Sequence, residues 1–444
     1  MKKPVIGFIS LGCPKNQIDT EIMLRELVDQ GYEITAEDYE ADIIIVNTCA
    51  FIESAKQEAI DNILDVAWLK EHRKLKGIIC CGCLAERYRE EVFNELPEVD
   101  AVVGTGSIHT IVEAVEKVWK GEKFYSCLPN EELILGGERV VTTPDYTAYI
   151  KIAEGCNNRC SYCAIPAIRG PFRSRPIEDI VSEARSLEEL GVKELVIVAQ
   201  DTTRYGLDLY GEYSLAKLLR ALSEGTTIPW FRLLYCYPDK ITDELIAEMR
   251  DNPRVVKYID LPIQHISDKV LKAMNRHGDG KLVRDTVRRL REGVPGITIR
   301  STAIVGFPGE TEEDFTELCT YIKEAAFDRF GVFPYSREEG TPAYDLPDQL
   351  DEQVKQDRYD ELMALQLDVH EALNQKKIGR TVKVLYEGFD PVAEVSYGRS
   401  EADAPEIDGK VYFTCPKGRY QEGDFVTVKI TEAINYDLFG EAES

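Results

Sequence analysis

The sequence lacks the features of a membrane protein or a typical zinc protein. No apolar run approaches the roughly 18 residues that a membrane span needs. The first apolar stretch, Pro4–Ile9, is too short for the core of a signal peptide. We therefore expect a cytoplasmic protein with no membrane partner. Only 5 histidines are present, none at zinc-finger spacing, and the cysteines do not form two C-x2-C pairs, so the usual zinc patterns are missing.

Positive charge is also scarce. The chain has 53 Lys and Arg against 79 Asp and Glu, a net charge of −26. Such a surface repels the phosphate backbone of nucleic acids and favours a basic partner, although a local basic groove would still permit RNA contact. The alternative is that the charge only keeps the protein soluble. The chain has no repeat of fixed period and no low-complexity tail, so its 444 residues predict two or three globular domains.

Cysteine is what the chain does have, and 12 cysteines in a cytoplasmic protein suggest metal or cluster binding rather than disulfides. Cys156, Cys160 and Cys163 form a C-x3-C-x2-C motif with no fourth cysteine nearby. Three thiolates can hold three corners of a 4Fe-4S cube and leave one iron open for chemistry. The glycine and asparagines of this loop favour a turn that wraps a bulky cofactor. The alternative is a set of structural or zinc-binding thiols.

A second set of cysteines follows the predicted strands of the N-terminal region. Strand and helix patterns alternate there, which predicts a parallel sheet with helices on both faces; the strands are Val5–Ser10, Ile43–Thr48, Ile78–Cys81 and Ala101–Gly104. Cys13, Cys49 and Cys83 follow the first three strands, at the sheet edge where ligands gather, and so predict a second cluster. Alternatively they are ordinary buried cysteines, as Cys80 and Cys81 in the strand core are expected to be.

The central region predicts a partial barrel of six strand–helix units. Its strands are Tyr149–Ile152, Glu194–Val198, Trp230–Leu234, Tyr258–Leu261, Thr298–Val305 and Phe330–Phe333. An active site is expected at their carboxyl ends, where polar residues follow: Gln200, Asp201, Asp239, Gln264 and His265. His265 is equally well explained as a structural residue. Gly306 lies in a glycine-containing loop that allows close approach of a ligand, and Thr311 with Asp314 predicts a capping box. Cys319 falls on the apolar face of the following helix and is expected to pack.

A helix over Glu352–Lys377 leads into short β runs at Val382–Gly388, Lys410–Phe413 and Phe425–Ile430, typical of a small antiparallel barrel. The predicted fold class is therefore α/β throughout most of the chain. An N-terminal parallel α/β domain (1–130) precedes a central partial (β/α)6 barrel (142–372) and a C-terminal β-barrel (376–444).

These three parts, in this order, resemble the radical S-adenosylmethionine (SAM) methylthiotransferases over essentially the full length. The resemblance implies one 4Fe-4S cluster on Cys156, Cys160 and Cys163, a second on Cys13, Cys49 and Cys83, and a C-terminal TRAM domain that recognises the substrate. It also places Tyr162 near the adenine of SAM and implies no catalytic residue beyond the cluster ligands. Gln200 and Gly306 are further expected SAM contacts, from their positions at the strand ends. SAM would be both the radical source and the methyl donor.

The segments Ser10–Asn16, Asn47–Ile52 and Lys151–Cys156 resemble the branch that modifies an aspartate of small-subunit ribosomal protein twelve. The tRNA-modifying branch tends to have Gln-x-Asn after the first cysteine, where this chain has Pro14-Lys15-Asn16. The resemblance thus implies a transferase that adds a methylthio group to the β-carbon of that aspartate, with an electron donor such as flavodoxin. The alternatives are a tRNA adenosine methylthiotransferase and a non-catalytic iron–sulfur or zinc protein.

The charge of the C-terminal barrel favours a basic protein substrate. Residues 376–444 contain 9 Lys and Arg against 13 Asp and Glu, a net charge of −4. Complementary charge speeds the encounter with a basic ribosomal protein. We therefore expect an acidic cluster, Glu401, Asp403, Glu406 and Asp408, to dock the substrate, the alternative being a solvated loop.

Overall fold

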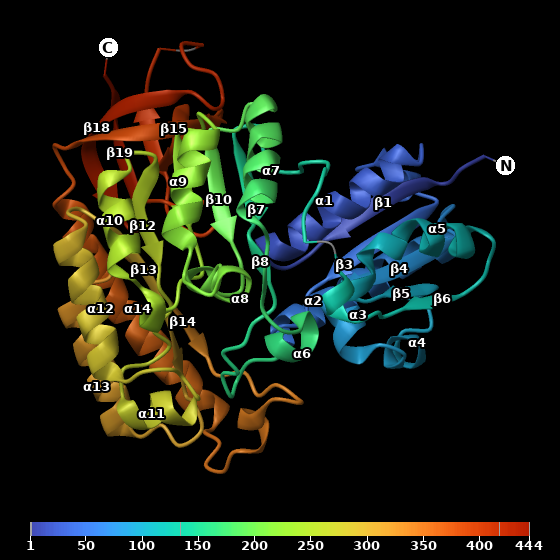
Figure 1. Cartoon of the computed structure of the whole chain (residues 1–444), viewed down its shortest axis with the longest axis horizontal. Helices are drawn as coiled ribbons and strands as arrows, with labels where there is room; N and C mark the ends of the chain where they lie inside the picture. Colours follow the sequence, from blue (N-terminus) through green and yellow to red (C-terminus); the bar gives the residue numbers. More distant parts are fainter. Residues whose placement is uncertain (1, 134, 417, 444) are drawn as a thin grey trace.

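The structure is a computed structural model that describes residues 2–133, 135–416 and 418–443. Three sheets organise the chain (Figure 1). The first is parallel, with strand order β2-β1-β3-β4-β5-β6. Its strands are β1 Val5–Ser10, β2 Glu33–Thr35, β3 Ile43–Thr48, β4 Gly77–Gly82, β5 Ala101–Val103 and β6 Phe124–Ser126. Separate apolar cores cover its two faces, as the strand–helix alternation predicts. Strands β2 and β6, each of three residues, were not predicted.

The helices of this sheet are α1 Pro14–Asp29, α2 Glu53–His72, α3 Cys83–Tyr88, α4 Glu91–Glu95 and α5 Ile111–Trp119. Cys80 and Cys81 are fully buried in β4, which confirms that they belong to the strand core. Among the described helices, none is long and apolar enough to cross a membrane.

The second sheet is the predicted partial barrel, with the order β14-β13-β12-β11-β10-β7 and parallel pairing throughout. Its strands are β7 Thr147–Lys151, β10 Glu194–Val198, β11 Trp230–Leu233, β12 Val255–Asp260, β13 Thr298–Val305 and β14 Arg329–Pro334. The helices between them are α7 Ile177–Glu189, α8 Leu207–Tyr210, α9 Leu215–Gly225, α10 Asp243–Asp251, α11 Asp268–Ala273, α12 Gly280–Gly293 and α13 Glu312–Ala325. The capping box of Thr311 and Asp314 is confirmed, and Cys319 packs against the barrel core.

Helix α14 (Glu352–Gln375) leads into a closed five-stranded barrel with the order β15-β16-β17-β19-β18. The strands are β15 Thr381–Asp390, β16 Val395–Ser400, β17 Val411–Thr414, β18 Phe425–Ile434 and β19 Asp437–Ala442. The predicted fold class is confirmed, with one difference of detail: β17 and β19 pair in parallel, while the other neighbours pair antiparallel.

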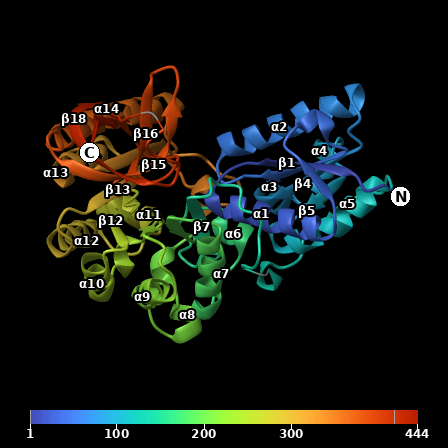
Figure 2. The same ribbon diagram turned by 90° about the horizontal axis from the view of Figure 1, so that it is seen from above.

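The N-terminal sheet and the C-terminal barrel contact different parts of the central sheet (Figures 1 and 2). The C-terminal barrel lies at the end where the central strands begin, and Phe425 packs edge-on against Trp230 at the start of β11. The N-terminal sheet lies beside β7, β8 (Ala153–Glu154) and α6 (Ile165–Arg169). The N-terminal domain also reaches the opposite, carboxyl end of β11, because Lys15 of α1 contacts the ring of Tyr235, which follows that strand.

The acidic loop of the C-terminal barrel does not form the expected docking surface. Asp403 is buried and forms an ion pair with Arg329, while Asp408 accepts a 2.6 Å hydrogen bond from the hydroxyl of Tyr258. The two carboxylates thus fix this barrel to the central sheet from inside. The prediction of a four-residue docking cluster is wrong, and so is the solvated-loop alternative, because only Glu401 and Glu406 are exposed. Sequence spacing could not distinguish the buried from the exposed carboxylates.

Candidate functional site

The C-x3-C-x2-C loop runs between β8 and α6, at the carboxyl end of the strand it follows. Gly155 has a positive φ of 78°, and a Cβ there would lie 2.1 Å from the carbonyl oxygen of Pro171, so only glycine fits this turn. The backbone N–H of Asn158 lies 3.5 Å from Sγ of Cys156. The Asn158 amide donates to Asp201 Oδ2 at 2.8 Å. Asp201 therefore holds the cysteine loop in place from the end of β10.

Two side chains that the sequence analysis missed contact Cys160. The hydroxyl of Tyr237 lies 2.7 Å from its Sγ, and Nη1 of Arg276 lies 4.0 Å from the same atom. The guanidinium of Arg276 stacks 3.8 Å from the centre of the Tyr237 ring. A hydroxyl and a buried cation both stabilise a thiolate. No sequence motif marks these two residues, since each lies far along the chain from the loop.

The N-terminal cysteines lie at the carboxyl ends of β1, β3 and β4. Cys13 is the N-cap of α1, Cys49 follows β3, and Cys83 begins α3. A Cβ on Gly12 would lie 2.7 Å from the Cβ of Cys49, so the first loop passes directly over the second. Cys13, Cys49 and Cys83 thus lie at the same edge of the sheet, as the sequence predicts, and their role as ligands of one cluster stays a prediction.

Burial raises the pKa of two thiols in each set, Cys49 and Cys83 in one and Cys156 and Cys163 in the other. It raises the pKa of Cys83 to about 12 and that of Cys156 to about 11, against the opposing effect of nearby Arg169 and Arg204 respectively. The Cys83 and Cys156 thiols are therefore neutral at physiological pH unless a metal displaces their protons. In the described part of the chain, no three His, Cys, Asp or Glu side chains lie close enough to share a single metal ion. Three thiols in each set have the donor chemistry of an iron–sulfur cluster ligated by cysteine.

A buried network of charges joins the two cysteine sets. Lys151 donates to Asp19 Oδ1 at 2.6 Å and to Glu154 Oε2 at 2.7 Å. Arg169 binds the same two carboxylates, at 2.5 Å and 3.4 Å. The other terminal nitrogen of Arg169 lies 3.4 Å from Sγ of Cys83. Arg169 ends α6, and Glu154 directly precedes Gly155. The C-x3-C-x2-C loop of Cys156, Cys160 and Cys163, hereafter the radical loop, is therefore connected through this network to Cys83 of the other set.

The network is balanced, with two cations against two anions. Burial raises the pKa of Glu154, but Lys151 and Arg169 outweigh it and lower that pKa to about 2. Glu154 is thus a permanent anion. Its second oxygen accepts a 2.5 Å hydrogen bond from the amide of Gln200.

The three predicted SAM contacts have different surroundings. Tyr162 packs against a small apolar cluster near Phe307 and Met274 and is close to Cys160. The carbonyl oxygen of Gln200 is buried with no partner among the described residues, as is that of Gln264, so both acceptors are available to a ligand that donates hydrogen bonds. Gly306 has a positive φ of 73°, and a Cβ there would lie 2.4 Å from Cγ of Lys355. At Gly306 the nearest neighbour is therefore α14 rather than an open ligand site. The roles of Tyr162, Gln200 and Gly306 as SAM contacts stay predictions.

The other two polar residues at the strand ends are enclosed. His265 is fully buried, and its Nδ1 accepts a 3.0 Å hydrogen bond from the backbone of Ser267. Burial lowers its pKa to about 4, so it is neutral. Asp239 forms an ion pair with its neighbour Lys240. Neither residue contacts a cysteine of either set in the described structure.

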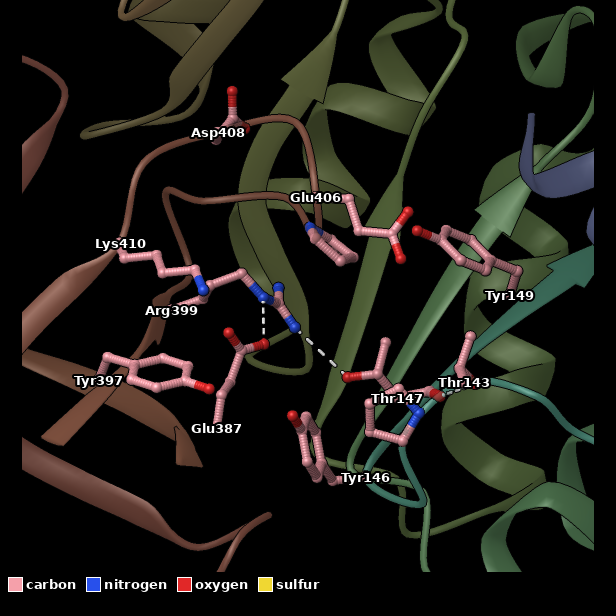
Figure 3. Close-up of a pocket in the computed structure, with 12 residues that line it drawn as sticks. Thr143, Tyr146, Thr147, Tyr149, Glu387, Tyr397, Arg399, Glu406, Asp408 and Lys410 are labelled. Atoms are coloured by element: carbon pink, nitrogen blue, oxygen red, sulfur yellow. Dashed lines mark hydrogen bonds and ion pairs between the residues drawn. The ribbon is translucent and has the colours of Figure 1, made fainter. Parts of the chain in front are cut away.

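A cavity of about 270 Å³ lies between the start of β7 and the C-terminal barrel (Figure 3). Three tyrosines line it, Tyr146, Tyr149 and Tyr397, together with five charged residues, of which Arg399 and Glu387 form an ion pair. Arg399 pairs with Glu387 at 2.6 Å, and Lys410 lies 4.3 Å from the centre of the Tyr397 ring. None of the twelve cysteines lines this cavity.

The chain matches three family models in the predicted order. Residues 5–104 match "Uncharacterized protein family UPF0004", residues 150–322 the radical SAM superfamily, and residues 378–442 the TRAM domain. Among solved structures, the radical S-adenosylmethionine methyltransferase TsrM from Kitasatospora setae, with cobalamin and a 4Fe-4S cluster bound, superposes with a TM-score of 0.59 at 15% identity, covering 77% of each chain. The likeness to TsrM supports the fold. The family model assigns the central region of this chain, residues 150–322, to the radical SAM superfamily.

Full-length relatives narrow the class. The chain is 50% identical over 441 residues to the ribosomal protein uS12 methylthiotransferase RimO of Desulforamulus reducens, covering 99% of both. It is 51% identical over 442 residues to the protein of the same name from Geobacter sulfurreducens, covering 99% of this chain and 98% of the relative. The chain belongs to the RimO family of radical SAM methylthiotransferases. The predicted family and its transferase class are thereby confirmed.

Proposed function

We propose that this protein replaces a hydrogen on the β-carbon of an aspartate in ribosomal protein uS12 with a methylthio group. The observation that carries the proposal is the identity of about 50% with RimO proteins along nearly the whole chain, cysteine segments included. The negative charge of −26 suits a basic ribosomal protein better than RNA. We place the enzyme in the cytoplasm, with a flavodoxin-like electron donor.

We assign one 4Fe-4S cluster to Cys156, Cys160 and Cys163 and the second to Cys13, Cys49 and Cys83. When bound, the two clusters and SAM supply the radical that removes the substrate hydrogen and the sulfur and methyl group that replace it. We assign domain boundaries at 1–130, 142–372 and 376–444, with the TRAM domain contacting the substrate.

The protein's own residues position and enclose these groups. One loop, Tyr235 to Tyr237, lies between the two cysteine sets: Tyr237 touches Cys160, and the ring of Tyr235 contacts Lys15, two residues after Cys13. The reacting carbon must lie within reach of both sets, and so close to this loop. Glu154, Gln200 and Tyr162 line the radical side, where the free amide oxygen of Gln200 suits the ammonium of an amino-acid cofactor. Cys49, Cys83, Cys156 and Cys160 are buried, and this burial helps to exclude water from reactive species.

The test is reconstitution of the purified protein with iron and sulfide, followed by incubation with SAM and a reductant. Ribosomal protein uS12 and tRNA are offered separately, and mass spectrometry measures the methylthio gain of each. We expect modification of the ribosomal protein only. Modification of tRNA instead would replace the substrate assignment and keep the radical chemistry, while zinc without iron would reject both.

A further inference from the structure

Lys15 is a buried lysine whose position has three unfavourable features. It is only 7% exposed. It lies in the first turn of α1, where the helix dipole disfavours a positive charge, and that turn contains no acidic residue. It also forms no ion pair with a carboxylate of the described residues, because Asp19, one turn further along α1, is bound by Lys151 and Arg169. A buried cation without an anionic partner is costly.

The described residues give Lys15 only an aromatic partner. Its Nζ lies 3.2 Å from the centre of the Tyr235 ring. Tyr235 has a φ of 61°, a left-handed conformation that is uncommon for a bulky residue. Its backbone N–H donates to Asp260 Oδ2 at 2.9 Å, which holds this conformation. Strained backbone of this kind is concentrated at functional sites.

The location of Lys15 connects it to the substrate. Lys15 lies two residues from Cys13, and its ring partner Tyr235 belongs to the loop whose other tyrosine touches Cys160. The ammonium therefore lies on the side of the N-terminal cysteines that faces the radical loop. A substrate carbon that must reach both cysteine sets brings its neighbouring groups within reach of this ammonium.

We propose that Lys15 binds the carboxylate of the substrate aspartate and thereby selects an acidic side chain as the target. This inference rests on the proposed function and adds the residue that recognises the reacting group. The carboxylate is bonded directly to the β-carbon that reacts, so one ion pair orients that carbon between the cysteine sets. The charge of the carboxylate also supplies the partner that the buried lysine lacks. Tyr235 keeps the ammonium in place when the substrate is absent.

The test compares two synthetic peptides that span the target loop of the ribosomal protein, one with the aspartate and one with asparagine in its place. Binding to the reconstituted enzyme is measured by calorimetry. We expect the wild type to bind the aspartate peptide about tenfold more tightly or better, the size expected for a charge-assisted hydrogen bond. Lys15→Met and Lys15→Gln should bind both peptides equally, at the affinity of the asparagine peptide. Lys15→Arg should restore the preference in part.

Lys76→Met is the matched control, since Lys76 also lies over an aromatic ring, 4.0 Å from the centre of Trp119, but is exposed and precedes β4, at the end of that strand opposite to Cys83. It should behave as the wild type. Iron content and melting temperature identify a variant that fails to fold. In that case the affinities of the wild type for the two peptides still test the proposal. Equal binding of both peptides by the wild type, or a retained preference in both neutral variants, would overturn the proposal. The proposal would also be overturned if the neutral variants kept the preference for the aspartate peptide while the reduction potential of the N-terminal cluster shifted. Lys15 would then only balance the charge of that cluster. Failure of the wild type to modify the ribosomal protein would instead reject the proposed function.

Discussion

Replacement of Arg169 by methionine tests whether the buried charge network holds the two cysteine sets together. The variant removes one cation and leaves Lys151 alone between Asp19 and Glu154, so the buried site carries one uncompensated negative charge. All four side chains are at most 2% exposed, and solvent cannot screen that charge. Removing one partner from a buried ion pair costs about 3–5 kcal/mol.

This cost should appear as easier separation of the N-terminal sheet from the central barrel. A loss of about 3 kcal/mol lowers the melting temperature of a unit of this size by roughly 6–12 °C. Calorimetry of the reconstituted protein measures the shift, and hydrogen exchange should increase selectively in α1 and β7. The double variant Arg169→Met with Asp19→Asn restores charge balance and should recover much of the loss.

Arg139→Met is the matched control. Arg139 is equally buried and joins the same parts of the chain, binding Glu21 at 2.6 Å and Glu183 at 3.1 Å, but it contacts no cysteine in the described structure. Both variants should lose stability. Only Arg169→Met removes the donor to Cys83, so only it should lower the reduction potential of the N-terminal cluster in a spectroscopic titration. An unchanged melting temperature in Arg169→Met, or equal potentials in the two variants, would refute this account of the network.

Three further predictions follow from the cysteines, from His370 and from the acidic loop. Alanine at Cys156, Cys160 or Cys163 should abolish the cleavage of SAM. Alanine at Cys13, Cys49 and Cys83 together should remove about half of the iron and stop methylthiolation, but SAM cleavage should continue. Unchanged iron content in this triple variant would point to other ligands. Burial, with Arg329 nearby, lowers the pKa of His370 to about 4, and its Nε2 accepts hydrogen bonds from Arg329 and Asn374. As the pH falls, the unfolded state takes up this proton before the folded state does. The free energy of unfolding should therefore fall by up to about 3 kcal/mol between about pH 6.5 and 4. Denaturation curves of His370→Gln over the same pH range should not show this fall. Asp403→Lys should detach the C-terminal barrel, which faster proteolysis after α14 would detect. The exposed control Glu422→Lys should leave the barrel attached and change only the salt-dependent binding of the ribosomal protein. Equal proteolysis of the two variants would contradict the role of the ion pair.

The sequence determined the parts of this protein that depend on neighbours along the chain. Strand and helix periods predicted the order of the three sheets, because side-chain alternation is a local property. The spacing of Cys156, Cys160 and Cys163 predicted one cluster site, because a single loop carries all three ligands. The strand ends before Cys13, Cys49 and Cys83 predicted a second set, because parallel strands bring their carboxyl ends to one edge.

The tertiary structure decided which distant side chains meet. Arg169 and Tyr237 contact the thiols of Cys83 and Cys160 across 86 and 77 residues of sequence, and no local pattern marks such pairs. The same limit explains the error over Asp403 and Asp408, which resemble exposed loop carboxylates until the arginines and the tyrosine of the central sheet surround them. Burial of a charge depends on the partners that folding brings to it, and those partners lie far away in the chain.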